Sequence, residues 1–257
     1  MSTRTSIEWT EQTWNPTVGC SKISPGCAHC YAEVMARRLQ AMRVKGYKNG
    51  FRLTLVPDRL DEPIKRKKPT IYFVNSMSDL FHEDIPDSYL RQIMAVIHRT
   101  PQHTYQILTK RAERMEEFFR TEQPPANAWI GVTVENRSHG LPRLDLLRRI
   151  PASVRFVSAE PLLEDLGIIN LTGIHWVIVG GESGPKARPM EKEWAFNIKK
   201  LCDEQNVAFF FKQWGSWGAD GKKRHKKQNG RLLGGRTWDG VPKPELLPLR
   251  GIFSNSV

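Results

Sequence analysis

Three of the four cysteines lie within eleven residues of the sequence, at Cys20, Cys27 and Cys30. Their spacing is C-x6-C-x2-C, and Pro25 and Gly26 favour a bend that lets thiolates from both ends of the loop converge. In a reducing compartment, a tight set of three cysteines is more typical of a metal or cluster site than of a disulfide framework. The spacing therefore predicts that these three side chains bind metal.

Three thiolates would leave one iron of a [4Fe–4S] cluster without a protein ligand. S-adenosylmethionine can bind that iron through its amino and carboxylate groups, and one electron from the cluster can then cleave the sulfonium to a carbon radical. Structural zinc is the alternative, because His29, His82 or His225 would complete a Cys3His set. The sequence favours iron, since it contains no second Cys-x2-Cys pair and no His-x3-His pair.

The elements that must position these cysteines follow a repeating order. Short apolar, β-branched runs alternate with longer stretches of helical character, which is typical of βαβ units around a parallel sheet. The predicted strands are Ile71–Asn75, Tyr105–Thr109, Trp129–Val134, Arg155–Ser158, Trp176–Val179 and Ala208–Lys212. The predicted helices are Tyr31–Val44, Ser88–His98, Arg111–Phe119, Leu141–Arg149 and Glu191–Gln205.

About six parallel strands suit an α/β fold of the partial parallel β/α (TIM-like) barrel type, with an open doubly wound sheet as the alternative. We assign residues 1–215 to the barrel. Residues 216–257 are rich in Gly, Lys and Arg, and we expect them to form an irregular basic extension packed on it. The first predicted helix is amphipathic, with Val34, Met35, Leu39 and Met42 near helical spacing.

Polar residues follow the predicted strands, and both folds place their sites at the carboxyl ends of the strands. The candidate catalytic residues are Asp79, Glu160 and Lys212. The candidate cofactor-binding residues are Ser76, Ser78, Asp79, Glu135, Gly180, Gly181 and Glu182. The two glycines would let backbone amides approach a ligand closely. For any single residue a capping or loop role is the alternative, but the whole set at corresponding strand ends favours a site.

Lys and Arg outnumber Asp and Glu by 39 to 27, which gives a net charge of +12. Such an excess favours contact with a polyanion such as nucleic acid, and a basic protein without that partner is the alternative. Much of the charge falls in the runs Lys65–Lys68 and Lys222–Lys227. The candidate nucleic-acid-binding residues are Lys110, Arg111, Lys222, Lys223, Arg224, Lys226 and Lys227.

No stretch approaches the roughly 20 apolar residues that cross a bilayer. The N-terminus also lacks the apolar core of a signal peptide. We therefore expect a cytoplasmic protein.

Longer motifs carry a family resemblance over nearly the whole chain. They are Trp14–Cys20, Ser24–Cys27, Cys30–Glu33, Phe73–Phe81, Leu108–Arg111, Gly180–Gly184, Phe210–Gly215 and Gly235–Asp239. In these motifs the sequence resembles the phage- and mobile-element-associated three-cysteine proteins, which are classed as radical-SAM-like and grouped loosely with spore photoproduct lyase.

The resemblance implies a barrel that binds a [4Fe–4S] cluster and S-adenosylmethionine, receives electrons from a donor, and repairs or modifies nucleic acid, with DNA favoured. It also implies that Asn75 to Asp79 occupy the place where radical-SAM barrels hold the methionine amino group. The first cysteine gap is six residues here, whereas most radical-SAM enzymes have three. Two other hypotheses stay open: a zinc-stabilised, non-catalytic nucleic-acid-binding protein, and a non-radical nuclease or methyltransferase that keeps a structural cluster.

Overall fold

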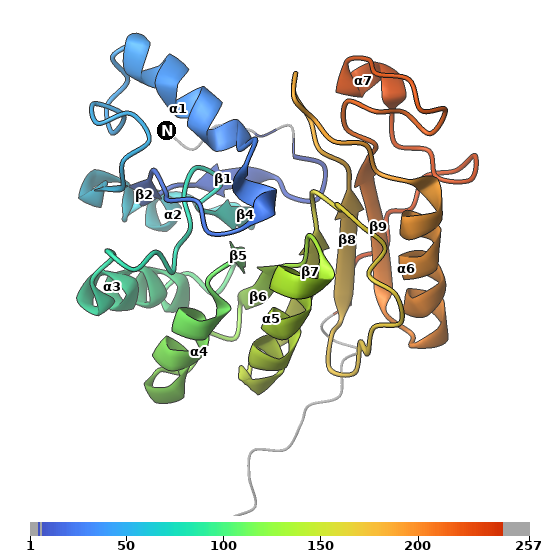
Figure 1. The fold of residues 1–257 in the computed structure, drawn as a ribbon. Coiled ribbons are helices and arrows are strands. Elements are labelled where there is room, and N and C mark those ends of the chain that lie inside the picture. Colours follow the sequence, from blue (N-terminus) through green and yellow to red (C-terminus); the bar gives the residue numbers. More distant parts are fainter. Residues whose placement is uncertain (1–4, 6, 244–257) are drawn as a thin grey trace, which may run out of the picture.

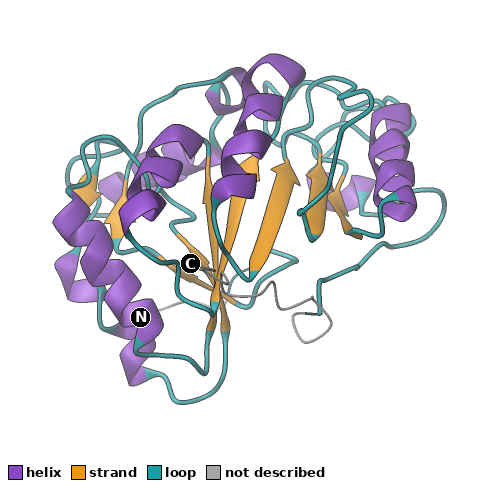
Figure 2. Ribbon diagram, turned by 90° about the horizontal axis from the view of Figure 1, so that it is seen from below, coloured by secondary structure: helices purple, strands orange, loops and turns teal. Residues whose placement is uncertain are grey.

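Seven parallel strands form one curled sheet in the computed structural model, which describes residue 5 and residues 7–243. Their order across the sheet is β1-β4-β5-β6-β7-β8-β9 (Figure 1). The strands are β1 (Gln12–Trp14), β4 (Ile71–Val74), β5 (Thr104–Thr109), β6 (Ala128–Thr133), β7 (Val154–Ala159), β8 (Trp176–Gly180) and β9 (Ala208–Gln213). From below, the strands form an arc with helices along its outer side (Figure 2). The predicted partial β/α barrel is confirmed.

The five predicted helices are present among the described residues, and the structure adds the short helices α2 and α7. They are α1 (Tyr31–Ala41), α2 (Glu62–Lys65), α3 (Asp87–His98), α4 (Ala112–Thr121), α5 (Arg137–Arg149), α6 (Lys192–Glu204) and α7 (Lys226–Asn229). Helix α5 begins ahead of the predicted Leu141 because the Asn136 side chain caps it, accepting a hydrogen bond from the backbone N–H of His139 at 2.9 Å. Within the described residues, no helix has the length and apolar character needed to span a bilayer.

Strand β1 is the one strand of the main sheet that the sequence pattern does not reveal, because three residues are too few to show an apolar period. It pairs in parallel with β4, with Trp14 opposite Val74. After β1, the short strands β2 (Thr17–Val18) and β3 (Thr54–Leu55) pair antiparallel. Together they place the cysteine segment at the β1 edge of the half-barrel.

The two faces of the sheet bury different side chains. The outer face packs aliphatic residues such as Ile130 and Val177 against the helices. The inner face carries a mostly aromatic cluster that consists of Trp9, Phe73, Trp129, Val154, Phe156, Trp176, Ile178 and Phe210. Successive strand residues point to opposite faces, so each strand contributes alternately to the two cores. The concave side of the half-barrel is therefore filled below the carboxyl ends of the strands.

Gly131 makes room for one of these rings. A Cβ at Gly131 would stand 2.6 Å from atoms of the Phe156 ring. We expect Gly131→Ala to lower the free energy of unfolding by about 1–3 kcal/mol, the usual effect of overpacking a core. Urea unfolding measures it, and the double variant Gly131→Ala/Phe156→Leu should recover part of the loss. Equal losses in the single and double variants would contradict this packing.

Helix α1 buries a different side from the predicted one. Ala32 and Ala36 pack against Val18 and Tyr47, because small side chains let the helix approach the β2–β3 layer closely. The larger residues Val34, Met35 and Met42 are instead 55%, 41% and 71% exposed, while Leu39 is half-buried. The amphipathic helix is present, but most of its predicted apolar face is turned to solvent.

Residues 216–243 run back along β9 and α6. The backbone N–H of Phe211 donates to the carbonyl of Trp238 at 2.9 Å, and the Trp176 indole N–H donates to the carbonyl of Gly240 at 2.7 Å. The Lys199 ammonium lies 4.1 Å from the centre of the Trp238 ring. These contacts join the segment to the sheet and to α6 as far as Gly240, and residues 244–257 of the predicted extension lie outside the described residues.

Candidate active site

A polar layer lies above the aromatic cluster on the concave side. Lys110 and Lys212 continue the inward-facing positions of β5 and β9. The Lys212 ammonium donates to both carboxylate oxygens of Glu160 at 2.8 and 2.9 Å, and Lys110 Nζ lies 3.5 Å from Thr133 Oγ1. Two of the three predicted catalytic residues, Glu160 and Lys212, therefore lie together, half-buried at the carboxyl ends of the strands.

The three cysteines lie on one segment beside this layer. Cys20 follows β2, Cys27 ends the short 3-10 helix η1 (Pro25–Cys27), and Cys30 is the N-cap residue of α1. The chain turns at Gly19, where φ is +82° and a Cβ would stand 2.2 Å from the Arg52 carbonyl oxygen. Only glycine fits such a position, so the turn that delivers Cys20 depends on it.

The far side of this cysteine loop is fixed by residues from β6 and β8. Arg188 forms an ion pair with Glu182 at 2.6 Å and donates from Nη2 to the Pro25 carbonyl oxygen at 2.9 Å. A Cβ at Gly26 would stand 3.2 Å from Cγ of Glu135, so the loop packs directly on that side chain. Glu135 and Glu182, predicted to bind cofactor, thus hold the cysteine loop across the half-barrel.

Glu135 is fully buried and paired. One carboxylate oxygen accepts a hydrogen bond from Arg143 Nη1 at 2.6 Å, and the same nitrogen donates to the Thr133 carbonyl at 2.7 Å. Burial alone would raise the pKa of Glu135, but the positive charges of Arg143 and Lys110 outweigh it and lower the pKa. The loop therefore rests on a carboxylate that stays charged.

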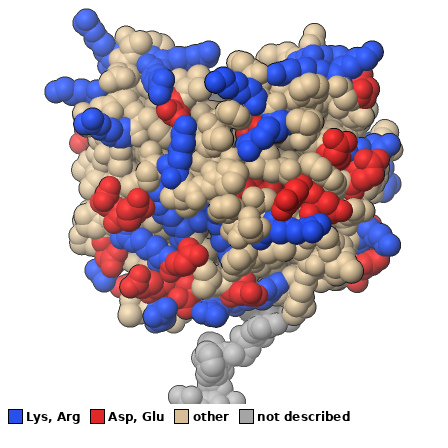
Figure 3. Space-filling model, in the orientation of Figure 1, with Lys and Arg blue, Asp and Glu red and all other residues tan. Residues whose placement is uncertain are grey.

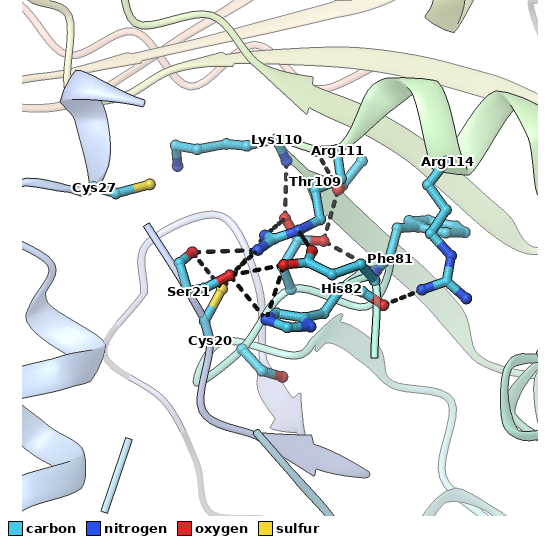
Figure 4. A network of polar contacts seen from close by, with 12 residues as sticks. Cys20, Ser21, Cys27, Phe81, His82, Thr109, Lys110, Arg111 and Arg114 are labelled. Carbon is cyan, nitrogen blue, oxygen red and sulfur yellow. Dashed lines mark hydrogen bonds and ion pairs between the residues drawn. The ribbon is translucent and has the colours of Figure 1, made fainter. Parts of the chain in front are cut away.

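Arg111 links Cys20 to the carboxylates beside it (Figure 4). Its guanidinium donates from Nη1 to Cys20 Sγ at 3.5 Å, from Nη2 to Ser21 Oγ at 2.7 Å, and from Nε to Glu83 at 2.7 Å. Asp79 lies 3.4 Å from the same group. Arg111 is only 7% exposed. It was predicted to contact nucleic acid, but burial among these partners turns its charge toward the cysteine loop instead of solvent.

His82 completes this network. Its Nδ1 accepts from the backbone N–H of Asp84 at 3.2 Å, so its Nε2 carries the proton and donates to Ser21 Oγ at 3.0 Å. Burial, and next the Arg111 charge, lower the pKa of His82. The hydrogen bond from Arg111 lowers the pKa of Glu83 to about 2. At neutral pH the network thus contains the neutral imidazole of His82, the carboxylate of Glu83 and the guanidinium of Arg111.

Asp79 has both carboxylate oxygens engaged. One accepts from the Thr109 hydroxyl at 2.6 Å and from the backbone N–H of Phe81 at 3.0 Å, and the other accepts from the backbone N–H of Lys110 at 3.0 Å. Asp79 therefore joins the ends of β4 and β5 and orients the Arg111 guanidinium. In this arrangement it positions other residues of the site.

Ser76 and Ser78 lie between the cysteine segment and β4. The Ser78 hydroxyl donates to the Thr17 carbonyl at 3.0 Å, and the Ser76 hydroxyl donates to Asn15 Oδ1 at 3.2 Å. The Tyr31 hydroxyl donates to the Ser76 carbonyl. These bonds join the segments on either side of Cys20 to the carboxyl end of β4.

The Gly180–Gly181 pair serves chain packing. A Cβ at Gly181 would stand 2.0 Å from the carbonyl oxygen of Trp214, and the Gly181 N–H donates to the Gln213 carbonyl at 3.0 Å. A Cβ at Gly180 would stand 3.2 Å from the Glu160 carboxyl group. The space predicted for a ligand is filled by the end of β9 and by Glu160.

The cysteines differ in their electrostatic surroundings. Burial, and next the Asp79 charge, raise the pKa of Cys20 to about 11, although Arg111 opposes this. Burial also acts to raise the pKa of Cys27, but the Lys110 charge and hydrogen bonds from Ser24 bring it below its ordinary value. The negative charge of Cys27 also acts to raise the pKa of Cys20. Figure 4 shows both side chains beside the Arg111 network.

All three thiols are half-buried, and cations stand beside two of them: Arg111 Nη1 lies 3.5 Å from Cys20 Sγ, and the Lys110 charge lowers the pKa of Cys27, which favours the thiolate there. No three His, Cys, Asp or Glu side chains in the described part of the chain are grouped so as to hold a single metal ion.

The C-terminal basic residues lie beyond the carboxyl end of β9. Lys222, Lys223 and Lys227 are exposed, and Arg224 pairs with Asp220. Helices α1 and α7 stand at the same end of the sheet (Figure 1), and Figure 3 shows a hollow between them with Lys and Arg side chains on both sides. The run Lys65–Lys68 precedes β4 and so lies at the opposite end.

Several residues of the site were not singled out as candidates from the sequence. Asn15, Thr17, Ser21 and Arg188 act through contacts with segments far away in the chain, up to the 163 residues between Arg188 and Pro25. Arg143 was detectable in principle, since a buried arginine within the apolar side of a helix needs a carboxylate partner.

Comparison with solved structures finds the same fold in spore photoproduct lyase. Against a cysteine-to-alanine mutant of spore photoproduct lyase the TM-score is 0.54, with 11% identity over 82% of this chain and 78% of the lyase chain. Against a tyrosine-to-phenylalanine mutant of the lyase the TM-score is 0.52, with 10% identity over 83% of this chain and 79% of the lyase chain. Against a double mutant of the lyase with bound AdoMet and dinucleoside spore photoproduct the TM-score is 0.48. The identity is 12%, over 79% of this chain and 64% of that chain. Our chain thus spans less than two thirds of the lyase chain in that complex.

The chain therefore shares its fold with spore photoproduct lyase, as predicted, and identities of this size show the fold alone. No curated protein matches the chain by sequence. Residues 4–242 match the family described as "Protein of unknown function (DUF5131)". The chain belongs to this family.

Proposed function

We propose that this protein is a radical S-adenosylmethionine enzyme that repairs or modifies nucleic acid, with Cys20, Cys27 and Cys30 as ligands of a [4Fe–4S] cluster. The observation that carries the proposal is the cysteine loop, which is held by ion pairs beside the carboxyl end of a parallel half-barrel. The lyase-like fold supports it. The cluster and S-adenosylmethionine would supply an electron and a carbon radical.

The chain's own residues would position these groups. Lys110, near Cys27, offers a cation for a carboxylate, and Glu160 with Lys212 offers a hydrogen-bonding pair within the polar layer. The aromatic cluster beneath excludes water from below. A substrate would enter through the hollow between α1 and α7 (Figure 3). Lys222 and Lys223 before α7 and Lys227 within it are exposed and would meet phosphates.

The test is cleavage of S-adenosylmethionine. Protein reconstituted with iron and sulfide without oxygen, then given S-adenosylmethionine and dithionite, should form 5′-deoxyadenosine. A fully loaded cluster that yields none contradicts the radical reaction. Stoichiometric zinc without iron would favour the zinc-stabilised binding protein.

The nucleic-acid part has a separate test. Lys222→Glu/Lys227→Glu should weaken binding to a DNA duplex and reduce the slope of log affinity against log salt by about two, near 0.9 for each lost phosphate contact. Lys67→Glu/Lys68→Glu removes the same charge at the opposite end of the sheet and should leave the slope less changed. Equal effects from the two pairs would mean that the charge acts without a defined site.

The Arg111 network makes a prediction about the cluster itself. Arg111→Met removes a hydrogen bond and a positive charge from the Cys20 sulfur, which stabilises the oxidised cluster. Its reduction potential should fall by on the order of 59 mV, a tenfold change in a one-electron equilibrium. Spectroscopic redox titration measures it. Arg120→Met, on the exposed side of the same helix, is the control, and equal potentials in the two variants would contradict the role of Arg111.

A further inference from the structure

The ion pair between Glu160 and Lys212 keeps hydrogen-bonding capacity that no described residue uses. The Lys212 ammonium has three N–H donors, and its nitrogen lies 2.8 and 2.9 Å from the two carboxylate oxygens of Glu160. Glu160 Oε1 also lies 3.4 Å from Gln213 Nε2. In the described part of the chain, Glu160 Oε2 accepts from Lys212 alone. One donor and one acceptor therefore lie side by side and remain available to a ligand.

The pair is accessible and carries no net charge. The side chains of Lys212 and Glu160 are 15% and 20% exposed, at the end of the sheet where α1 and α7 leave a hollow (Figure 1, Figure 3). A phosphate that approached the Lys212 ammonium would also meet the Glu160 carboxylate, and the repulsion between the two anions would offset the attraction. A neutral group with its own donor and acceptor therefore suits the pair better than a phosphate.

The cations around α7 differ from Lys212 in this respect. Lys222 precedes α7 and Lys227 lies within it, and both are exposed. Neither ammonium has a carboxylate partner among the residues that the structure describes. Such cations suit phosphates, which position a nucleic acid without reading its sequence. Phosphates would thus stay near α7, and the part of the nucleic acid that reaches Glu160 would be a base.

The Watson–Crick edge of a nucleobase has the required chemistry. It places an N–H donor beside an acceptor, and enzymes that act on a base hold it through this edge. In a duplex these groups are already bonded to the partner base, so a base must leave its pair before it can offer them to a protein. The expected occupant is therefore an unpaired nucleotide.

Tyr31 supplies a ring for the face of such a base. It is the first residue of α1 and is 56% exposed. Its hydroxyl donates to the Ser76 carbonyl, so the ring is the part that remains available. Burial of the hydroxyl, and next the charges of Cys30 and Glu160, raise the pKa of Tyr31, so its phenol lies within electrostatic reach of Glu160. An aromatic ring combined with hydrogen bonds to the edge is how proteins hold an unstacked base.

We propose that Glu160 and Lys212 bind the hydrogen-bonding edge of an unpaired nucleobase whose face stacks on Tyr31. The inference rests on the proposed function, because it names the substrate group of the same site. Glu160 accepts the N–H of the base, and Lys212 donates to the neighbouring carbonyl oxygen or ring nitrogen. The site thus distinguishes a base from the sugar–phosphate backbone, which the cations around α7 bind.

Binding to three DNA duplexes tests the role of the edge. Each duplex carries one unpaired position, which holds thymine, N3-methylthymine or an abasic sugar. Thymine is the probe because its N3–H has a carbonyl on both sides, and the methyl group removes this donor from a ring that can still stack. Reconstituted wild-type protein without dithionite should bind the thymine duplex about tenfold more tightly than the abasic one, since stacking and edge bonds are both lost. The N3-methylthymine duplex should fall between them.

Two variants separate the edge from the face. Glu160→Leu/Lys212→Met replaces both members of the pair with apolar groups and leaves the net charge unchanged, so it should bind the thymine and N3-methylthymine duplexes equally. Tyr31→Leu should bind both more weakly and still prefer thymine to N3-methylthymine. Glu204→Leu/Lys200→Met removes an exposed ion pair of α6 in the same way and should behave as the wild type.

Equal binding of the thymine and N3-methylthymine duplexes by the wild type would overturn the inference, and this result does not depend on how the variants fold. So would a preference that survives in Glu160→Leu/Lys212→Met, or a variant whose only defect is weaker binding of S-adenosylmethionine, since the pair would then serve the cosubstrate. A wild type that binds none of the duplexes would refute the nucleic-acid part of the proposed function, and this inference with it. The radical reaction is judged separately, because these measurements need no turnover.

Discussion

Cys27→Ala is expected to abolish iron binding, with the content falling from about four iron atoms per chain toward none. The variant leaves two thiols, and it removes the one whose pKa the Lys110 charge holds low. A thiolate is the form that binds metal, so this position should be the most sensitive of the three. Iron and sulfide assays after anaerobic reconstitution give the result.

The chain supplies its own matched control. Cys202 is fully buried in α6, where burial raises the pKa of its thiol to about 12. Cys202→Ala removes the same chemical group and should keep the full iron content, with only a loss of stability from the cavity. Iron retained in Cys27→Ala, or lost equally in Cys202→Ala, would refute the assignment of ligands.

Arg143→Met should destabilise the protein by about 3–5 kcal/mol, the usual cost of leaving a buried charge without its partner. Glu135 has no solvent exposure and loses its ion pair at 2.6 Å. Urea unfolding at pH 7 measures the effect. Arg149→Met, on the exposed side of α5, should change stability little, and Glu135→Gln/Arg143→Met should recover a large share of the loss.

The dependence of the free energy of unfolding on pH shows whether the charge of Glu135 causes this loss of stability. In the native protein the pKa of Glu135 is lowered, so its stabilising contribution is present above the unfolded pKa and is lost as pH falls through the lower native value. In Arg143→Met the largest charge that opposes burial is absent, so burial raises the pKa of Glu135. The difference between wild type and variant should therefore shrink as pH falls from that raised pKa to the lowered pKa of the wild type. A difference that stays constant down to pH 3 would mean that packing, not charge, explains the loss.

The fold could be predicted from the sequence because its signals are local. Strands β4 to β9 are apolar runs long enough to stand out, and all were placed within about two residues, the usual margin for element ends. Strand β1 escaped because Gln12–Trp14 is too short. The buried face of α1 escaped because two alanines, Ala32 and Ala36, pack more closely than the larger residues beside them.

The candidate site could be predicted only in outline. Glu160 and Lys212 were both expected at strand ends, yet their ion pair joins positions 52 residues apart. Arg111 was predicted with Lys110 to contact nucleic acid, and only the fold brings Asp79 and Glu83 to it. The roles of these residues depend on contacts between segments that are far apart in the sequence. The apolar periodicity of the sequence predicts helices and strands but not such contacts.

The most direct test of the proposed cluster is the metal content of the protein purified without oxygen, together with its visible spectrum. We expect a brown protein with broad absorption near about 400 nm, as for cysteine-ligated clusters. Iron and sulfide should occur in equal amounts, and both should disappear in Cys27→Ala. A colourless protein with one zinc per chain would contradict it, and the three cysteines would then belong to a structural site.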